Sequence, residues 1–157
     1  MTVSLGNPAP NFSLPNQDNT PISLGDFAGK WLVIYFYPKD DTPGCTIEAC
    51  QFTNALEDLQ NLDAVVLGVS ADDPQSHQDF IAKFKLKIDL LSDTAMDMIK
   101  AYGVWGEKVR DGKTSMGIHR QTFIIDPQGN LAAHWPTVTP DGHAKEVEAK
   151  IKSLKGE

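Results

Sequence analysis

The sequence lacks any apolar run long enough to span a membrane, and its charges are not massed on one segment. A membrane span needs about 20 consecutive apolar residues, so we expect no membrane partner. The 14 basic and 21 acidic side chains give a net charge of −7 and are scattered, which argues against a nucleic-acid partner. The start of the chain lacks a basic segment followed by an apolar run, so no secretory signal is expected. A cytoplasmic location is the default, or an organelle stroma if a transit peptide has been removed.

Cysteine is also scarce, since Cys45 and Cys50 are the only two. Two cysteines are too few for a disulfide scaffold. In a reducing compartment a close pair more often binds a metal or carries out redox chemistry. Zinc is the weaker interpretation, because the CxxxxC spacing is long for a chelating arm and no second Cys or His pair lies nearby in sequence.

The hydrophobic pattern predicts one α/β domain spanning residues 1–157. Residues 31–37 and 64–70 are unbroken apolar runs, typical of strands covered on both faces, and residues 42–61 between them carry a helical pattern. These segments form a parallel βαβ unit. The other predicted elements are a helix at 74–86 with Asp73 as its cap, a strand at 88–91, a helix at 93–102 capped by Asp93, a hairpin of 122–126 and 130–135, and a helix at 144–154.

This order resembles the thioredoxin fold, with an N-terminal extension and an inserted helix and strand. It implies a central mixed sheet flanked by helices. Residues 103–117 show no clear period, and we predict a loop there that borders a site.

Cys45 occupies a special position in the predicted fold. Thr42 suits a helix N-cap and Pro43 suits the first helical position, so Cys45 falls in the first turn of the helix. Unpaired backbone N–H groups and the helix dipole favour an anion there, which favours a thiolate. The position also follows the C-terminal end of a central strand, where open α/β sheets hold ligands. A small buried side chain is the alternative interpretation of Cys45.

Cys50 lies on another face of the same helix, with Asn54 and Glu57. In an intact helix it is rotated by about 140° from Cys45, and the two Cα atoms are roughly 8.6 Å apart. A disulfide does not close beyond about 7 Å without backbone movement. If the two cysteines pair, the first turns of the helix must unwind.

A reactive thiolate here needs a cation as well as the helix. An ordinary thiol with a pKa near 8.5 is about 3% ionised at pH 7, and lowering that pKa to 6 takes roughly 3.4 kcal/mol. A helix terminus supplies about 0.3 to 2 kcal/mol, and the charges of Asp40 and Asp41 act in the opposite direction. Lys39 and Arg120 are the candidate cations. From the sequence alone, an exposed strand-end residue is the simpler interpretation of Arg120.

The segment PKDDTPGCTIEAC, residues 38–50, resembles the peroxiredoxins. Its second cysteine, five residues after the first, resembles the Q-type or bacterioferritin-comigratory-protein subfamily. The resemblance covers nearly the whole chain and includes GNPAPNFSLPNQDN, LLSDTAMDMIKAYGVWGEK and GIHRQTFIIDPQG.

The resemblance implies a hydroperoxide reductase without metal or organic cofactor. Cys45 would be the attacking cysteine and Cys50 the one that resolves its sulfenic acid as a disulfide. Thr42 would hydrogen-bond the peroxide and the sulfur, Pro38 would shield the pocket, and Arg120 would stabilise the thiolate. Thioredoxin or glutaredoxin would donate electrons, and the protein would be a monomer or weak dimer.

Two other functions share these cysteines. A general thiol-disulfide oxidoreductase would prefer a CxxC pair, which this chain lacks. A peroxide-sensing or chaperone-like protein would need no rapid turnover. Within the motif, Glu48 fits a first-turn acid as well as a catalytic group. The four histidines show no ligand spacing, and we expect them on the surface or in strands.

Overall fold

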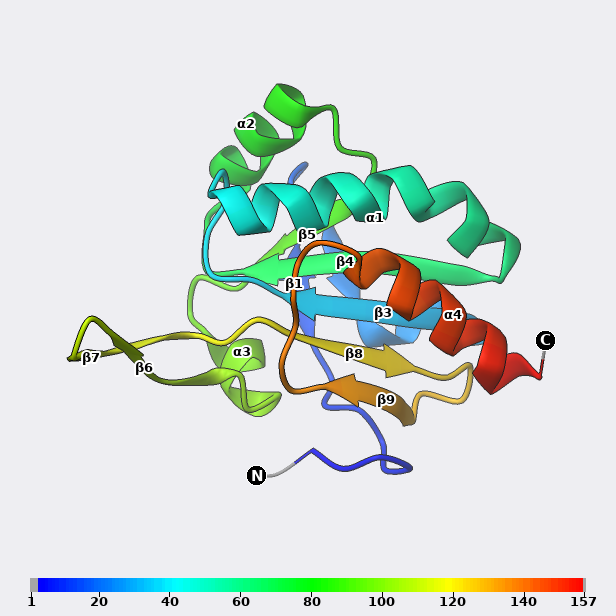
Figure 1. Ribbon diagram of the computed structural model, residues 1–157. Helices are drawn as coiled ribbons and strands as arrows, with labels where there is room; N and C mark the ends of the chain where they lie inside the picture. Colours follow the sequence, from blue (N-terminus) through cyan, green and yellow to red (C-terminus); the bar gives the residue numbers. More distant parts are fainter. Residues whose placement is uncertain (1–2, 157) are drawn as a thin grey trace.

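The computed structural model describes residues 3–156 and centres on a five-stranded sheet in the order β5-β4-β3-β8-β9 (Figure 1). Its strands are β3 (Trp31–Phe36), β4 (Ala64–Ser70), β5 (Asp89–Ser92), β8 (Gln121–Ile125) and β9 (Leu131–Trp135). β3, β4 and β5 run parallel, whereas β8 and β9 are antiparallel to their neighbours. This is the mixed sheet that the sequence predicts.

Helices cover both faces of this sheet, which explains the unbroken apolar runs. The helices α1 (Pro43–Asn61), α2 (Pro74–Phe84) and α4 (His143–Lys155) lie on one face, and α3 (Asp97–Ala101) lies on the other (Figure 1). Val33 and Tyr35 of β3 join the core under α1, α2 and α4, while Leu32 and Ile34 join the core on the opposite side. A strand that is buried on both faces has apolar side chains on both, so its sequence does not alternate between apolar and polar residues.

The N-terminal extension covers the face of the sheet that also carries α3. It contains β1 (Ser13–Pro15), β2 (Pro21–Ser23) and the short 3-10 helix η1 (Leu24–Phe27). Ala9 and Phe12 of this extension are buried in the same core as Met98 and Ile99 of α3. No helix within residues 3–156 is long and apolar enough to cross a membrane.

Residues 103–117, predicted as a loop, contain most of a two-stranded arm, so that prediction is wrong. β6 (Trp105–Arg110) pairs antiparallel with β7 (Lys113–Ile118), and the arm projects from the body of the molecule (Figure 1). Asp111 and Gly112 form the turn with φ of 53° and 75°, as a type I′ turn requires. Most of the arm is exposed, so its sequence shows no alternation of apolar and polar residues.

The helix predicted at 93–102 is also shorter than expected. α3 begins only at Asp97, and Met96 before it has a left-handed backbone with φ of 64°. The Asp93 carboxylate still serves the start of this helix, because it accepts a hydrogen bond from the backbone N–H of Ile99 at 2.7 Å. Asp93, which lies four residues before the first residue of α3, therefore caps this helix.

Candidate active site

The first turn of α1 holds Cys45 where the sequence predicts it. Thr42 is the N-cap, Pro43 is the first helical residue, and Cys45 is 1% exposed. The Thr42 hydroxyl does not cap the helix, because it donates a hydrogen bond to the carbonyl of Lys39 at 2.9 Å. With no side chain capping α1, its first N–H groups remain available to a negative charge.

Arg120 reaches the sulfur from the neighbouring strand. It directly precedes β8, whose antiparallel pairing of Gln121 with Phe36 sets it beside the end of β3. Its Nη2 donates a hydrogen bond to Cys45 Sγ at 3.2 Å, and its side chain is only 17% exposed. The interpretation of Arg120 as an exposed strand-end residue is therefore wrong. Lys39, the other candidate cation, is exposed.

Gly44 leaves room for this guanidinium. A Cβ on Gly44 would lie 3.2 Å from Arg120 Nη2, tighter than ordinary van der Waals contact. The glycine between Pro43 and Cys45 thus permits the close approach of Arg120 to the helix start. The motif therefore supplies both the sulfur and the space for its cation.

Glu48 is the site residue that the sequence analysis did not select. Its side chain is fully buried, and Oε1 accepts a hydrogen bond from Arg120 Nη1 at 2.8 Å. Burial raises the pKa of Glu48 from 4.5 to about 7, although the charge and hydrogen bond of Arg120 oppose the rise. Glu48 lies three residues after Cys45, on the same side of the helix. An acidic residue on an otherwise apolar helix stripe is the signal that would have revealed it.

A pocket of about 910 Å³ opens beside this cluster. Pro38, Thr42, Gly44 and Arg120 line it, together with residues of the β6–β7 arm. The structure therefore brings Pro38, Thr42 and Arg120 together at the start of α1, with Cys45 buried next to them. The arm borders this site, as expected for residues 103–117.

Cys50 stands apart from this pocket. It is half-buried against the core and lines a separate groove of about 740 Å³, with Asn54, Glu57 and Phe84 among the lining residues. α1 is continuous through Cys45 and Cys50, and both carry free thiols. In this conformation the two cysteines lie on different faces of one helix, as predicted.

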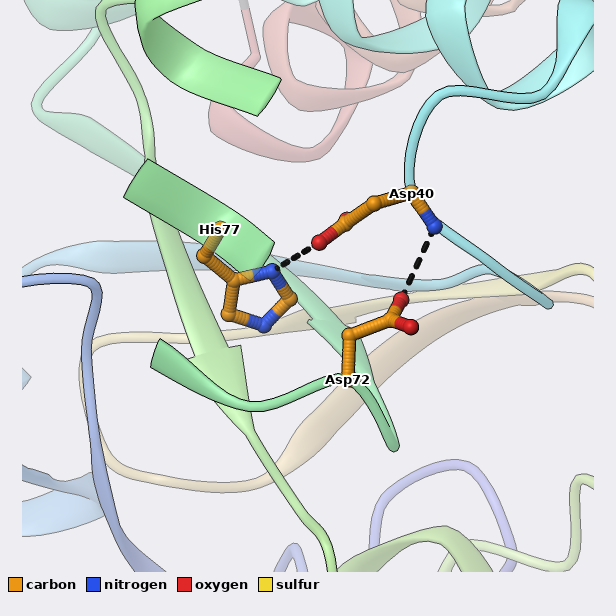
Figure 2. A group of neighbouring side chains, drawn as sticks. All are labelled: Asp40, Asp72 and His77. Atoms are coloured by element: carbon orange, nitrogen blue, oxygen red, sulfur yellow. Dashed lines mark hydrogen bonds and ion pairs between the residues drawn. The ribbon is translucent and has the colours of Figure 1, made fainter. Parts of the chain in front are cut away.

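The loop before α1 is held by a second polar cluster, Asp40, Asp72 and His77 (Figure 2). One ligand atom from each lies within 4.8 Å of the others, so the group has the donors for a metal ion. The oxygens already have other partners, however. Asp40 accepts hydrogen bonds from Tyr37 and Ser76 and lies 2.7 Å from His77 Nδ1, while Asp72 accepts one from the backbone N–H of Asp40.

The surroundings of His77 make this cluster a hydrogen-bond network. His77 Nε2 lies 3.0 Å from the carbonyl of Leu91 and Nδ1 lies 2.7 Å from Asp40, so both ring nitrogens already have hydrogen-bond partners. A metal ion would have to displace these contacts. The expectation that the histidines lie on the surface or in strands is wrong for His77 and His143, which are buried and belong to α2 and α4.

The chain is similar to known proteins over most of its length. The model of the AhpC/TSA family matches residues 5–134. The chain belongs to the AhpC/TSA family. It is 45% identical to a putative peroxiredoxin Bcp from Coxiella burnetii, over 96% of this chain and 100% of that protein. It is 41% identical to peroxiredoxin Bcp from Bacillus subtilis, over 98% of each chain.

Solved structures of AhpC/TSA relatives share the fold. A cysteine-to-serine variant of PrxQ from Xylella fastidiosa superposes with a TM-score of 0.92, at 36% identity and 98% coverage of both chains. The bacterioferritin comigratory protein of Xanthomonas campestris superposes with a TM-score of 0.87, at 40% identity and 91% coverage of both. That protein is described as having alkyl peroxide reduction activity. The predicted thioredoxin-like fold with its N-terminal extension and inserted helix and strand is confirmed.

Proposed function

We propose that this AhpC/TSA protein is a thiol-dependent peroxidase in which the Cys45 thiolate attacks hydroperoxides. The observation that carries the proposal is the 3.2 Å hydrogen bond from Arg120 to a buried sulfur in the first turn of a helix. A hydrogen bond to a charged group contributes about 1.5–3 kcal/mol and a helix terminus about 0.3–2 kcal/mol. Both interactions stabilise negative charge on the Cys45 sulfur, which suits it to act as the nucleophile of the site.

The first step is a displacement at oxygen. The thiolate attacks the terminal oxygen of the hydroperoxide, an S–O bond forms, and the O–O bond breaks. Sulfur is oxidised to a sulfenic acid, and the peroxide leaves as an alkoxide or hydroxide that takes a proton to become an alcohol or water. Arg120 stabilises the negative charge as it passes from sulfur to the leaving oxygen.

Thr42 and Pro38 shape the place where the peroxide lies. Because the Thr42 hydroxyl gives its proton to the carbonyl of Lys39, its oxygen is left to accept a hydrogen bond from the peroxide O–H. Pro38 offers the pocket an apolar wall without an N–H donor. We assign both residues to substrate positioning.

The second step regenerates the enzyme through Cys50. The Cys50 thiol attacks the Cys45 sulfenic acid, the S–S bond forms, and the hydroxyl leaves as water. Because the two thiols lie on different faces of intact α1, the first turns of the helix must unwind before this step. A dithiol protein, thioredoxin or glutaredoxin, then reduces the disulfide by exchange, which requires a reducing compartment such as the cytoplasm. We propose a monomer or weak dimer as the working unit.

The test is steady-state consumption of hydrogen peroxide with thioredoxin, thioredoxin reductase and NADPH. Wild type is compared with Cys45→Ser and Cys50→Ser, and oxidised products are weighed by mass spectrometry. We expect wild type to turn over, Cys45→Ser to be inactive, and Cys50→Ser to stop as a sulfenic acid or mixed disulfide. Activity retained in Cys45→Ser would contradict the proposal.

The same samples separate the alternative functions. A peroxide sensor would be oxidised once per chain without sustained NADPH consumption. A general oxidoreductase would reduce a protein disulfide such as insulin faster than it reduces peroxide. Either result would replace the peroxidase assignment.

A further inference from the structure

The pocket beside Cys45 is much larger than hydrogen peroxide requires. Its volume is about 910 Å³, within the roughly 300–1,000 Å³ range of pockets that hold organic ligands. Hydrogen peroxide is only slightly larger than water, whose share of liquid volume is about 30 Å³. The pocket therefore has room for the organic part of a larger hydroperoxide.

The β6–β7 arm gives this pocket a positive wall in an otherwise acidic protein. The chain carries a net charge of −7, yet the charged residues lining the pocket include Lys108, Arg110 and Arg120. Glu107 also lines it, and it is the one acidic residue in that lining.

Lys108 is held in place on this wall. It is half-buried, and its aliphatic stem lies against Gly117 of the neighbouring strand. A Cβ on Gly117 would lie 3.0 Å from Lys108 Cδ and 3.3 Å from Cε, so the glycine leaves the space that the stem occupies. Lys108 is directly opposite Ser115 across the arm, and Ser115 also lines the pocket.

The Lys108 ammonium has no anionic partner within the described part of the chain. No hydrogen bond or ion pair joins it to a carboxylate of residues 3–156, and Glu107, next to it in β6, points to the other face of the strand. Burial lowers the pKa of Lys108, and the charge of Arg120 lowers it further while Cys45 raises it. A half-buried cation beside a second cation is unfavourable until an anion joins them.

We propose that Lys108 binds a carboxylate group of the substrate, so that the enzyme selects organic hydroperoxides that carry a carboxylate. This inference rests on the proposed peroxidase function. The carboxylate contacts Lys108, the alkyl chain crosses the pocket, and the hydroperoxide reaches Cys45 between Thr42 and Arg120. The chemistry is unchanged: the O–O bond breaks, sulfur is oxidised, and the product is a hydroxy acid that keeps its carboxylate. Lys108 keeps its proton throughout.

The test compares two substrates that differ only in the charge. We would measure kcat/KM for 6-hydroperoxyhexanoate and for its methyl ester, with hydrogen peroxide as a third substrate, at low and at high salt. In wild type we expect the acid to exceed the ester by about tenfold at low salt, as one charge-assisted hydrogen bond provides. In Lys108→Gln we expect this ratio to fall to about 1.

Lys113→Gln is the matched control, since it removes the same charge from the same arm. Lys113 lies next to the turn of the arm and is not among the residues that line the pocket. We expect it to keep the wild-type ratio of acid to ester. If Lys113→Gln reduces the ratio as much as Lys108→Gln does, the preference comes from the general field of the arm and the proposal is wrong.

Two other outcomes would overturn the inference and leave the peroxidase function intact. Wild type that reduces hydrogen peroxide but shows no preference for the acid over the ester would exclude carboxylate selection. If Lys108→Gln lowers kcat/KM equally for all three substrates, the ratio of acid to ester is unchanged. Lys108 would then act on the Cys45 thiolate and not on the substrate carboxylate. If wild type reduces none of the three, the proposed function itself fails.

Discussion

The buried carboxylate of Glu48 leads to a prediction about stability and pH. Its side chain is fully buried, and burial raises its pKa from 4.5 to about 7 despite the ion pair with Arg120. Between these two pH values the folded protein binds a proton that the unfolded chain has lost. Stability from this group is therefore fully present below pH 4.5 and is lost as pH rises through about 7.

The size of the effect follows from the shift. Each pKa unit corresponds to 1.36 kcal/mol, so the shift from 4.5 to about 7 amounts to roughly 3 kcal/mol. That is a large share of the 5–15 kcal/mol by which domains are usually stable. Glu48→Gln keeps an oxygen that accepts the Arg120 hydrogen bond but has no charge to bury. We expect it to match wild type near pH 4.5 and to exceed it by roughly 3 kcal/mol at pH 8.

The assay is urea denaturation of both proteins under reducing conditions between pH 4.5 and 8. The difference between the two free energies of unfolding isolates Glu48, because all other titrating groups are common to both. Glu57→Gln, an exposed position on the same helix, is the control and should show no such difference. If Glu48→Gln is less stable than wild type at pH 8, the charged Glu48–Arg120 pair stabilises the fold and the reasoning is refuted.

Three further substitutions test the geometry of the site and the core. Arg120→Met removes the donor to the sulfur and should lower kcat/KM for hydrogen peroxide about 10²–10³-fold, and a loss below threefold would contradict its role. Gly44→Ala places a Cβ 3.2 Å from Arg120 Nη2, so the rate of Cys45 oxidation by peroxide, measured by stopped flow, should fall about tenfold. This loss is expected even though alanine favours a helix more than glycine does. Gly68→Ala, whose Cβ would lie 2.7 Å from Leu90 Cδ2 and 2.8 Å from Tyr35 Cζ, should cost about 1–3 kcal/mol in urea denaturation. An unchanged midpoint would show that this core relaxes freely.

Sequence patterns predicted the elements that are buried on both faces. β3 and β4 are continuous apolar runs because helices or the N-terminal extension cover each side. The start of α1 was equally readable, since Thr42 and Pro43 are suited to an N-cap and a first helical residue. In these segments the local conformational preference of the residues agrees with their burial, so the sequence alone is sufficient to predict the elements.

The β6–β7 arm escaped prediction because exposure removes the hydrophobic alternation on which strand assignment depends. The dipeptide Asp111–Gly112 was the available signal, since both residues adopt the positive φ of a tight hairpin turn. The role of Arg120 was predicted only by the resemblance to the peroxiredoxins, because the residues alone favoured an exposed strand end. Its approach to Cys45 depends on the pairing of β3 with β8, and a single sequence does not specify which strands pair.

The double contact of Arg120 links the oxidation state of the sulfur to the integrity of α1. One guanidinium contacts Cys45 through Nη2 and Glu48 through Nη1, and both residues belong to the turns that would unwind to form the proposed Cys45–Cys50 disulfide. When the thiolate becomes a neutral sulfenic acid, the attraction to Nη2 weakens, and the helix start loses one of its two tethers to the sheet. Oxidation itself would then release the helix, so the enzyme would open only after peroxide had reacted.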